Sequence, residues 1–391
     1  MMNVGLSPRD KKQQAKTRFF IEGGIILALL ILSMLVLPLA IPAFRLKLVG
    51  RFLAMAIVAL GIDLIWGYTG LLSLGHGIFF ALGGYAFAMH LSLQLPNNAI
   101  PDFFMLYGVN DLPLFWQPFY SLPFTLMAMV LIPGAVAAIL GYLVFRNRIK
   151  GVYFSIITQA ALLVFFNFFN GQQKLINGTN GLKTDTALFF GQRVGDTPMQ
   201  IAFYEITIVA LLLVYLLCRW LTSGRFGRLL IAIRDDETRV RFTGYDPTWF
   251  KVVVFAISGA IAGVSGALYT VQTGIITPNF MDVGFSIEMV IAVAVGGRAT
   301  LSGAILGTIL VNFARIYLSE NYEETWLFFQ GALFLLVVTV LPDGIIGWGR
   351  DVLWFQVRKW LGMDSTITYP AIADADDPDL NKIQDQLVTK E

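Results

Sequence analysis

The sequence has 391 residues, of which 56% are hydrophobic and only 14% are charged, with a mean hydropathy of +0.69. This composition excludes an ordinary soluble fold and favours the bilayer as the solvent, because the apolar runs reach the roughly 20 residues that cross a membrane as helix. A transmembrane β-barrel is excluded, since short alternating segments are lacking. The net charge of +2, with basic residues in short clusters between apolar runs, argues against binding nucleic acid.

The amino-terminal region, residues 1–18, is basic, and an apolar stretch follows over 19–41. The core of a signal peptide has only about 7 to 15 residues and ends at a small-residue cleavage site, which we do not find here. We therefore expect a retained first helix whose basic end is cytoplasmic.

Further apolar runs predict an all-α, polytopic bundle of about ten transmembrane helices, within a range of eight to ten, over residues 19–346. The first run below is long enough for two crossings. Cys218, the one cysteine, is interpreted as an inert core thiol. The runs cover 52–91, 120–145, 151–170, 200–218, 252–276, 284–297, 300–318 and 326–346.

Two basic segments set the predicted orientation, because Lys and Arg gather on the cytoplasmic side. Both termini and the segment 219–251 are then inside, while the loops 92–119 and 171–199 are outside. The first basic segment holds Arg146, Arg148 and Lys150, and the second holds Arg219, Arg225, Arg228, Arg234, Arg239, Arg241 and Lys251. This orientation puts the acidic residues Glu320, Glu323 and Glu324 outside. It also puts three basic residues outside, against the rule that Lys and Arg gather in the cytoplasm: Arg45, Lys47 and Arg51.

The carboxy-terminal region, residues 347–391, is expected to be cytoplasmic. Residues 352–361 mix Trp and Phe with Arg358 and Lys359, which is typical of a helix lying on the membrane surface. The acidic, polar tail over 373–391 predicts disorder.

A catalytic or metal site is not supported, because the two histidines, His76 and His90, lack carboxylates or cysteines at ligand spacing. His90, close to the outer edge of its span, is expected at the membrane interface. The sequence also lacks the G-x-x-x-x-G-K-[ST] motif, so any ATP that drives the protein binds a separate chain. We expect no enzyme activity and no cofactor in this chain.

Glycines crowd the stretch GYTGLLSLGHGIFFALGG at 67–84. Such a density indicates either close helix packing or broken helices that line a pathway. Tyr68, Thr69, Ser73 and His76 supply polar groups near the break, which keeps the pathway reading open.

A second group of small residues, SGAIAGVSGAL at 258–268, has Gly259 and Gly263 at G-x-x-x-G spacing, and Gly303 with Gly307 repeats it. For this group we expect helix packing.

Ionisable residues inside predicted spans are costly and therefore candidates for function. Asp63, His76 and Glu288 are the candidate pathway groups. The alternative for Asp63 and Glu288 is a position within reach of an interface or beside a neutralising neighbour. Arg315 is read as an anchor near a helix end.

The segment GRFGRLLIAIRDDETRVRFTGYDPTWFK at 224–251 predicts a short amphipathic helix-turn-helix under the membrane. Asp235 or Asp236 would cap the second helix, and Gly244 would end it in a left-handed conformation. Such a segment suits docking to another protein, although a solvated loop of mixed charge is the alternative.

Four stretches together resemble the permeases of the branched-chain amino acid and urea branch of ATP-binding-cassette importers. They are GYTGLLSLGHGIFFALGGYA at 67–86, GRFGRLLIAIRDDE at 224–237, FTGYDPTWFKVVVFAISGAIAGVSGAL at 242–268 and VGGRATLSGAILG at 295–307. The resemblance implies a bundle with broken, glycine-rich helices in a bacterial inner membrane. It also implies that Arg234, Asp235, Asp236, Glu237, Thr238, Arg239 and Gly244 belong to a coupling helix that contacts the ATPase.

Within that branch, the chain is similar to the second permease subunit of urea importers. Asp63 stands where amino-acid permeases of this type usually carry Asn, and the stretches 100–116 and 177–183 resemble the external loops of the urea subgroup. The implied partners are a homologous permease, two cytoplasmic ATPases, an external solute-binding protein and membrane lipid. A branched-chain amino acid permease is the alternative, followed by a stand-alone channel or ion-coupled carrier and by a membrane-embedded enzyme.

Overall fold

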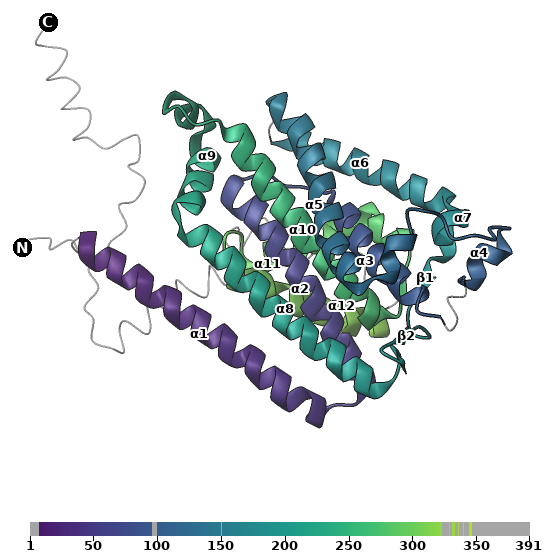
Figure 1. Ribbon diagram of the computed structural model, residues 1–391. Helices are drawn as coiled ribbons and strands as arrows, with labels where there is room; N and C mark the ends of the chain where they lie inside the picture. Colours follow the sequence, from purple (N-terminus) through teal and green to yellow (C-terminus); the bar gives the residue numbers. More distant parts are fainter. Residues whose placement is uncertain are drawn as a thin grey trace, which may run out of the picture. The chain divides into compact units, whose positions relative to one another are not determined.

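The computed structural model describes residues 8–95, 100–149 and 151–322, with a few isolated positions between 328 and 345, and the side chains from residue 23 onward. Within this part the chain is helical, with four two-residue strands. Figure 1 shows the long helices side by side. The predicted all-α class is therefore confirmed.

Seven of the described helices are long and apolar enough to cross a membrane. Two further helices of the described part, of 17 and 14 residues, are shorter, and the 14-residue one is also apolar. The predicted tenth span, 326–346, and the predicted surface helix and tail, 352–361 and 373–391, lie outside the continuously described residues. The long helices are α1 (Pro8–Ala40), α2 (Ala43–Thr69), α5 (Leu122–Arg146), α6 (Val152–Gly171), α8 (Thr197–Ser223), α10 (Pro247–Thr273) and α12 (Leu301–Asn321), and the shorter ones are α3 (His76–Ser92) and α11 (Val283–Gly296).

The remaining elements lie at the two ends of these helices. Helix α9 (Arg225–Phe242) is polar and marks what we call the α9 end. At the opposite end, β1 (Leu182–Lys183) pairs antiparallel with β4 (Ile275–Ile276), and we call this the strand end. The other short elements are α4 (Asp102–Leu106), η2 (Gln117–Tyr120), α7 (Gln173–Ile176), η3 (Gly178–Asn180), β2 (Leu188–Phe189), β3 (Gln192–Arg193) and η4 (Pro278–Met281).

The first two helices differ from the expected boundaries. Helix α1 begins at Pro8 rather than at residue 19, and α2 begins directly after Pro42 rather than at residue 52. Arg45, Lys47 and Arg51 therefore lie in the first turns of α2 and not in a loop. Hydropathy misplaced this boundary because the charges find distant partners, which are described below.

Helix α10 lies at the centre of the helix packing, where it contacts α2, α3 and α5. Two serines on α10 donate hydrogen bonds to carbonyls of antiparallel α2: Ser258 Oγ to Gly61 O at 2.5 Å and Ser265 Oγ to Ala54 O at 2.6 Å. Both pairs are seven residues apart on each helix, so they join the same two faces. Bonds of this kind between membrane helices contribute about 0.6 kcal/mol each on average.

Small residues bring the helix backbones together, as the G-x-x-x-G patterns predict. A Cβ added to Gly83 on α3 would lie 2.0 Å from Gly263 O on α10, and one added to Gly266 would lie 1.8 Å from Phe80 O. These oxygens belong to backbone and have no rotamer to relieve the overlap. The packing interpretation of 258–268 is therefore confirmed.

The glycine-rich break at 70–75 is the connection between α2 and α3, not an interruption within one helix. Its backbone groups are bonded by α6: Ser155 Oγ donates to Leu72 O at 2.6 Å, and Thr158 Oγ1 accepts from Leu74 N at 3.1 Å. Irregular backbone inside a membrane protein requires this kind of satisfaction by neighbouring helices. The break is thus held by packing in the observed conformation.

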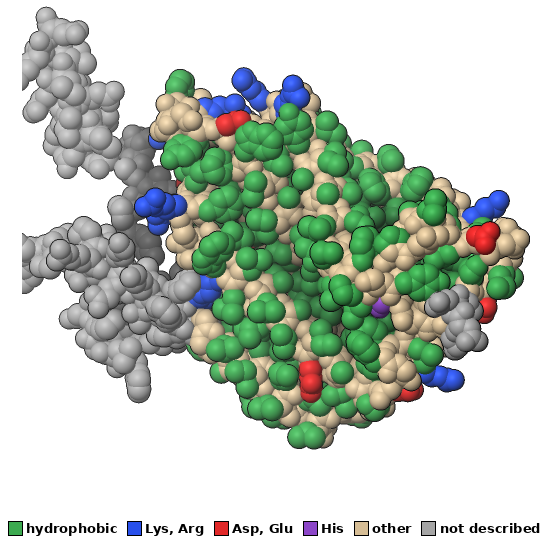
Figure 2. Space-filling model, viewed as in Figure 1, with side chains coloured by type: hydrophobic (Ala, Val, Ile, Leu, Met, Phe, Trp, Pro, Cys, Tyr) green, Lys and Arg blue, Asp and Glu red, His purple; other side chains and the backbone are tan. Residues whose placement is uncertain are grey.

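The surface shows the same division into spans and ends. In Figure 2, hydrophobic side chains cover most of the face shown, while Lys and Arg gather over the top, at the ends of α5 and α9. Exposed aliphatic side chains on α5, α6 and α8 include Leu131, Val164 and Leu213. Such a surface suits lipid or another membrane helix.

Candidate functional site

His76 opens α3 and lies in the interior, with only 1% of its surface exposed. Its Nε2 is 2.7 Å from Ser258 Oγ, and the Ser258 hydroxyl donates its single proton to Gly61 O. Nε2 therefore carries the proton that is donated to Ser258. The ring also meets Phe79 and Phe255 edge-on, at 5.7 and 6.0 Å between centroids. In this arrangement His76 links α3, α10 and α2.

Asp63 lies on α2 and is completely buried. Its Oδ1 accepts a hydrogen bond of 2.7 Å from the backbone N–H of Ala299, in the turn between α11 and α12. Ala299 has a positive φ of 61°, so the carboxylate holds a turn that L residues rarely adopt. Its Oδ2 is buried and has no hydrogen-bond partner among the described groups.

The other candidate groups near the break serve the local backbone. Thr69 Oγ1 donates to Ile65 O of its own helix at 2.6 Å, and Ser73 Oγ accepts from Gly75 N at 3.3 Å. Tyr68 is half-buried and packs against the core. These three therefore lie beside Asp63 and His76 in the chain, and none of the five side chains lines either of the two pockets described below.

Glu288 on α11 and Arg315 on α12 form an ion pair. The Glu288 side chain is 5% exposed and that of Arg315 is 40% exposed. From the sequence alone, Glu288 was expected in the pathway and Arg315 was expected to be an anchor near a helix end. The ion pair could have been predicted, because the two residues carry opposite charges on adjacent predicted spans.

Helix α9 bends at Asp236, whose φ and ψ of −157° and 96° are not helical. The carboxylate of Asp236 caps the second part of α9, accepting from Thr238 N at 2.9 Å and from Arg239 N at 3.1 Å. Gly244 follows the helix with a φ of 85°. The capped helix-turn-helix, including the left-handed Gly244, is thus confirmed in its geometry.

The second part of α9 is fastened to α10 by a buried carboxylate. Glu237 accepts from Lys251 Nζ at 2.7 Å and from Arg241 at 2.8 Å, and its side chain is 8% exposed. Lys251 also lies 5.7 Å from the centre of the Phe145 ring on α5. Glu237 therefore acts within the chain, whereas Thr238 and Arg239 are exposed at the surface.

The first part of α9 is tied to α2. Arg234 Nη1 donates to Gly67 O at 2.9 Å, and its Nε lies 3.2 Å from the exposed Asp235. Gly67 is one turn from Asp63, so a hydrogen-bonded route leads from α9 through α2 to the α11–α12 turn. Arg219 was predicted to begin the basic segment 219–251 between two spans. Instead it lies in the last turns of α8, where it is buried and donates a hydrogen bond to Tyr215 Oη.

A pocket of about 490 Å³ opens at the α9 end, between the end of α5 and the turn that joins α9 to α10. Its lining combines three arginines with aromatic rings. Those residues are Tyr142, Arg146, Arg148, Arg241, Gly244, Tyr245, Asp246, Thr248 and Trp249.

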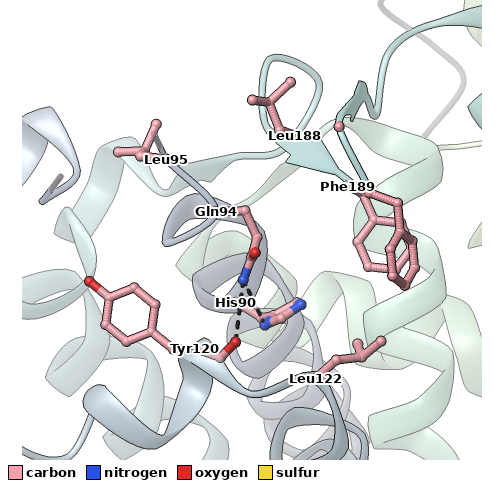
Figure 3. Close-up of a pocket in the computed structure, with 9 residues that line it drawn as sticks. His90, Gln94, Leu95, Tyr120, Leu122, Leu188 and Phe189 are labelled. Atoms are coloured by element: carbon pink, nitrogen blue, oxygen red, sulfur yellow. Dashed lines mark hydrogen bonds between the residues drawn. The ribbon is translucent and has the colours of Figure 1, made fainter. Parts of the chain in front are cut away.

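A second pocket, of about 380 Å³, lies at the strand end between the two predicted outer loops (Figure 3). His90 Nδ1 lies 2.7 Å from Phe119 O, and Gln94 Nε2 donates to Tyr120 O at 3.4 Å. Phe190, at the tip of the β2–β3 hairpin, is 81% exposed and has a positive φ of 47°. His90 is thus buried within the protein and lines the inner part of this pocket.

The strand end carries the basic residues that disagreed with the predicted orientation. Lys47 pairs with Asp185 at 3.1 Å. Arg51 Nε donates to Gln272 O at 3.2 Å, at the carboxy-terminal end of α10 where carbonyls lack helical partners. These partners lie 138 and 221 positions away, so sequence reasoning missed them.

Comparison with known proteins agrees with this architecture. Residues 44–338 match the family described as branched-chain amino acid transport system, permease component. The high-affinity branched-chain amino acid transport system permease protein LivM of Salmonella typhimurium is 27% identical over 318 residues, covering 76% of this chain and 68% of the relative. The probable LivM permease of Methanocaldococcus jannaschii is 26% identical over 321 residues, covering 74% and 89%.

The related LivH permease of Escherichia coli is 25% identical over 314 residues, covering 75% of this chain and 91% of the relative. No solved structure matches the chain.

Proposed function

Because the chain belongs to the branched-chain amino acid transport permease family, it is a membrane subunit of an ATP-binding-cassette importer, and we propose that the solute it translocates is urea. A permease component of this family is a transport subunit and not an enzyme. Family membership favours a transport subunit over the alternatives of a stand-alone channel and a membrane-embedded enzyme. A branched-chain amino acid remains the second candidate solute, on the strength of the relatives' names.

The observation that carries the urea proposal is the carboxyl group of Asp63. One oxygen is held by Ala299 N, and the other is buried without a partner among the described groups. Urea is small and neutral and presents N–H donors, so a fixed hydrogen-bond acceptor suits its passage. A zwitterionic amino acid brings a carboxylate, which a neighbouring aspartate would repel, together with an ammonium group, which it would attract.

Asp63 is closed off in the observed conformation, so the proposal requires a second one. Alternating access would open the helices around Asp63 and the α11–α12 turn to one side at a time. His76, Tyr68, Thr69, Ser73 and Glu288 are the further candidates for groups along this path. The bonds of His76 to Ser258 Oγ, of Thr69 and Ser73 to nearby backbone, and of Glu288 to Arg315 would be exchanged during the cycle.

Asp63→Asn provides the sharpest test of the solute. Asparagine keeps the size and one acceptor for Ala299 N–H, but replaces the second oxygen with a donor. In a strain that lacks the native gene, the wild-type chain should restore uptake of labelled urea and not of labelled leucine. The Asp63→Asn chain should lose most urea uptake while reaching the membrane at wild-type levels. Restoration of leucine uptake by the wild-type chain would favour the amino acid.

Coupling to ATP hydrolysis is proposed to pass through α9. One of the two cytoplasmic ATPases would contact the exposed face that holds Thr238 and Arg239, and the capped turn at Asp236 and Gly244 would fix its direction. Arg234 would carry movement to α2 through Gly67, and from there to Asp63. Binding of ATP by the isolated chain would contradict this division of labour.

The orientation proposed for the complex puts the α9 end in the cytoplasm of a bacterial cell and the strand end outside. The excess of arginine at the α9 end supports it, since cytoplasmic loops carry more Lys and Arg. Both termini would be cytoplasmic. An external solute-binding protein would then contact the loops 92–119 and 171–199, and a homologous permease would cover part of the apolar surface.

A further inference from the structure

The pocket at the α9 end has an excess of positive charge that the chain itself does not neutralise. Arg146 and Arg148 are exposed at the end of α5, and Arg241 faces the same pocket from α9. Counting the buried neighbour Lys251, four cations face two carboxylates, Glu237 and Asp246.

The two carboxylates are committed to other contacts. Glu237 is shared between Arg241 and Lys251, at 2.8 and 2.7 Å. Asp246 caps α10 by accepting from Thr248 N at 3.0 Å. Arg146 donates to the neutral Tyr142 Oη at 3.1 Å, and Arg148 has no ion-pair partner in the described part of the chain. The two exposed arginines are therefore available to an external anion.

The walls of the pocket have the composition of a membrane interface. The Tyr142 and Trp249 rings meet at 5.5 Å, and Arg146 lies 5.6 Å from the centre of the Tyr142 ring. Aromatic rings of this kind settle at the level of lipid headgroups. Further along the same two helices, exposed aliphatic side chains follow: Leu143 is 56% exposed on α5 and Val253 is 44% exposed on α10.

We propose that this pocket binds the phosphate of an anionic phospholipid, with Arg146, Arg148 and Arg241 around the headgroup and the acyl chains along α5 and α10. Guanidinium groups suit phosphate because their fixed donors bond two oxygens at once. The exposed aliphatic side chains separate a lipid from a free phosphate compound, which offers them nothing to contact. Acidic side chains of an ATPase are the other occupant that the charges would admit, but they would leave Leu143 and Val253 uncovered.

Such a lipid would touch the turn that directs α9. Gly244, Tyr245 and Asp246 line the same pocket as Arg146 and Arg148. A bound headgroup therefore joins the end of α5 to the α9–α10 turn. We expect anionic lipid to fix the direction of α9, so that the lipid composition of the membrane affects transport.

The test compares the full-length chain with the double variant Arg146→Gln/Arg148→Gln by native mass spectrometry in detergent. Both proteins are titrated with phosphatidylglycerol and with phosphatidylcholine that carries the same acyl chains. Wild type should prefer phosphatidylglycerol, and the double variant should bind it on the order of tenfold more weakly, since each basic residue near an anionic surface strengthens binding. Arg228→Gln, an exposed arginine of α9 outside the pocket, is the matched control and should bind as wild type does.

Two further arms identify the source of the anion. Glycerol phosphate should not displace phosphatidylglycerol; full displacement would assign the pocket to a soluble phosphate compound and overturn the lipid proposal. Unchanged phosphatidylglycerol binding by the double variant would overturn it too. If that variant also lost a co-purifying ATPase, the arginines would belong to the protein interface instead.

Discussion

The two ends of the helical unit differ in how their Lys and Arg side chains are paired. At the strand end, Lys47 pairs with Asp185, and Arg51 bonds carbonyls at the end of α10, so the cations join parts of the chain to one another. At the α9 end, one buried carboxylate, Glu237, is shared by two cations, and further arginines stay exposed. Counting Lys and Arg therefore indicates orientation only after the internally paired residues have been set aside.

The largest expected effect of breaking this comparison comes from Glu237→Gln. This substitution removes the negative charge that buried Lys251 and Arg241 share. Disrupting a buried ion pair in this way lowers the free energy of unfolding by about 3 kcal/mol. We expect the second part of α9 to loosen from α10. Faster hydrogen exchange of the amides over 237–246 would measure it.

Asp235→Asn is the control for Glu237→Gln, because Asp235 lies two positions earlier and its side chain is 65% exposed. Its exchange pattern should match wild type. Equal effects of the two substitutions would contradict the anchoring role of Glu237.

A smaller effect is expected from Gly244→Val. A Cβ at Gly244 meets no atom within 4 Å, so the cost arises from its φ of 85° alone and is about 1 to 2 kcal/mol. Because this strain tilts α9 away from its direction, uptake and solute-stimulated ATP hydrolysis should fall together in the reconstituted complex.

Gly244→Asn is the matched variant, since asparagine tolerates the left-handed region better than valine does. It should retain most coupling. Wild-type coupling in the valine variant would move the ATPase contact elsewhere, with the loop 146–151 as the next candidate.

At the strand end, the Lys47–Asp185 pair should contribute less than about 1 kcal/mol, because its side chains are 21% and 46% exposed. A double-mutant cycle with Lys47→Ala and Asp185→Ala would measure the coupling energy through thermal unfolding. A coupling energy near the roughly 3 kcal/mol expected for the loss of the Glu237 carboxylate would remove the contrast between the two ends.

The smallest effect concerns pH. The backbone N–H and hydroxyl of Thr248, and then Arg241, lower the pKa of Asp246. A carboxylate with a lowered pKa stabilises the folded state above its unfolded pKa of about 3.9, and this contribution is lost as the pH falls through the folded value. The protection factor of the Thr248 amide, which corrects for the intrinsic pH dependence of exchange, should therefore fall in acid, and Asp246→Asn should remove this fall. An unchanged pH profile in that variant would exclude the cap as its source.

Local signals were sufficient to predict much of the α9 end. A carboxylate before a short polar helix and a glycine after it predicted the cap at Asp236 and the turn at Gly244, because caps depend on residues a few positions apart. Small residues at four-residue spacing likewise predicted that 258–268 packs closely against another helix, and the structure identifies α3 as a helix that does so.

Long-range pairing explains what the sequence did not reveal. The beginning of α2 was misplaced because the partners of Lys47 and Arg51 lie in distant segments. Asp63, His76 and Glu288 were expected inside predicted spans and lie within helices, but their partners, Ala299, Ser258 and Arg315, follow only from how the helices pack. Whether the three residues contact solute stays a prediction.

Site-specific photo-crosslinking in the assembled importer tests the assignment of the two ends most directly. One crosslinker replaces Thr238, exposed on α9, and another replaces Phe190, exposed at the tip of the β2–β3 hairpin. The proposed orientation predicts that Thr238 captures the ATPase and Phe190 captures the solute-binding protein. Capture of the solute-binding protein from Thr238, or of the ATPase from Phe190, would contradict it.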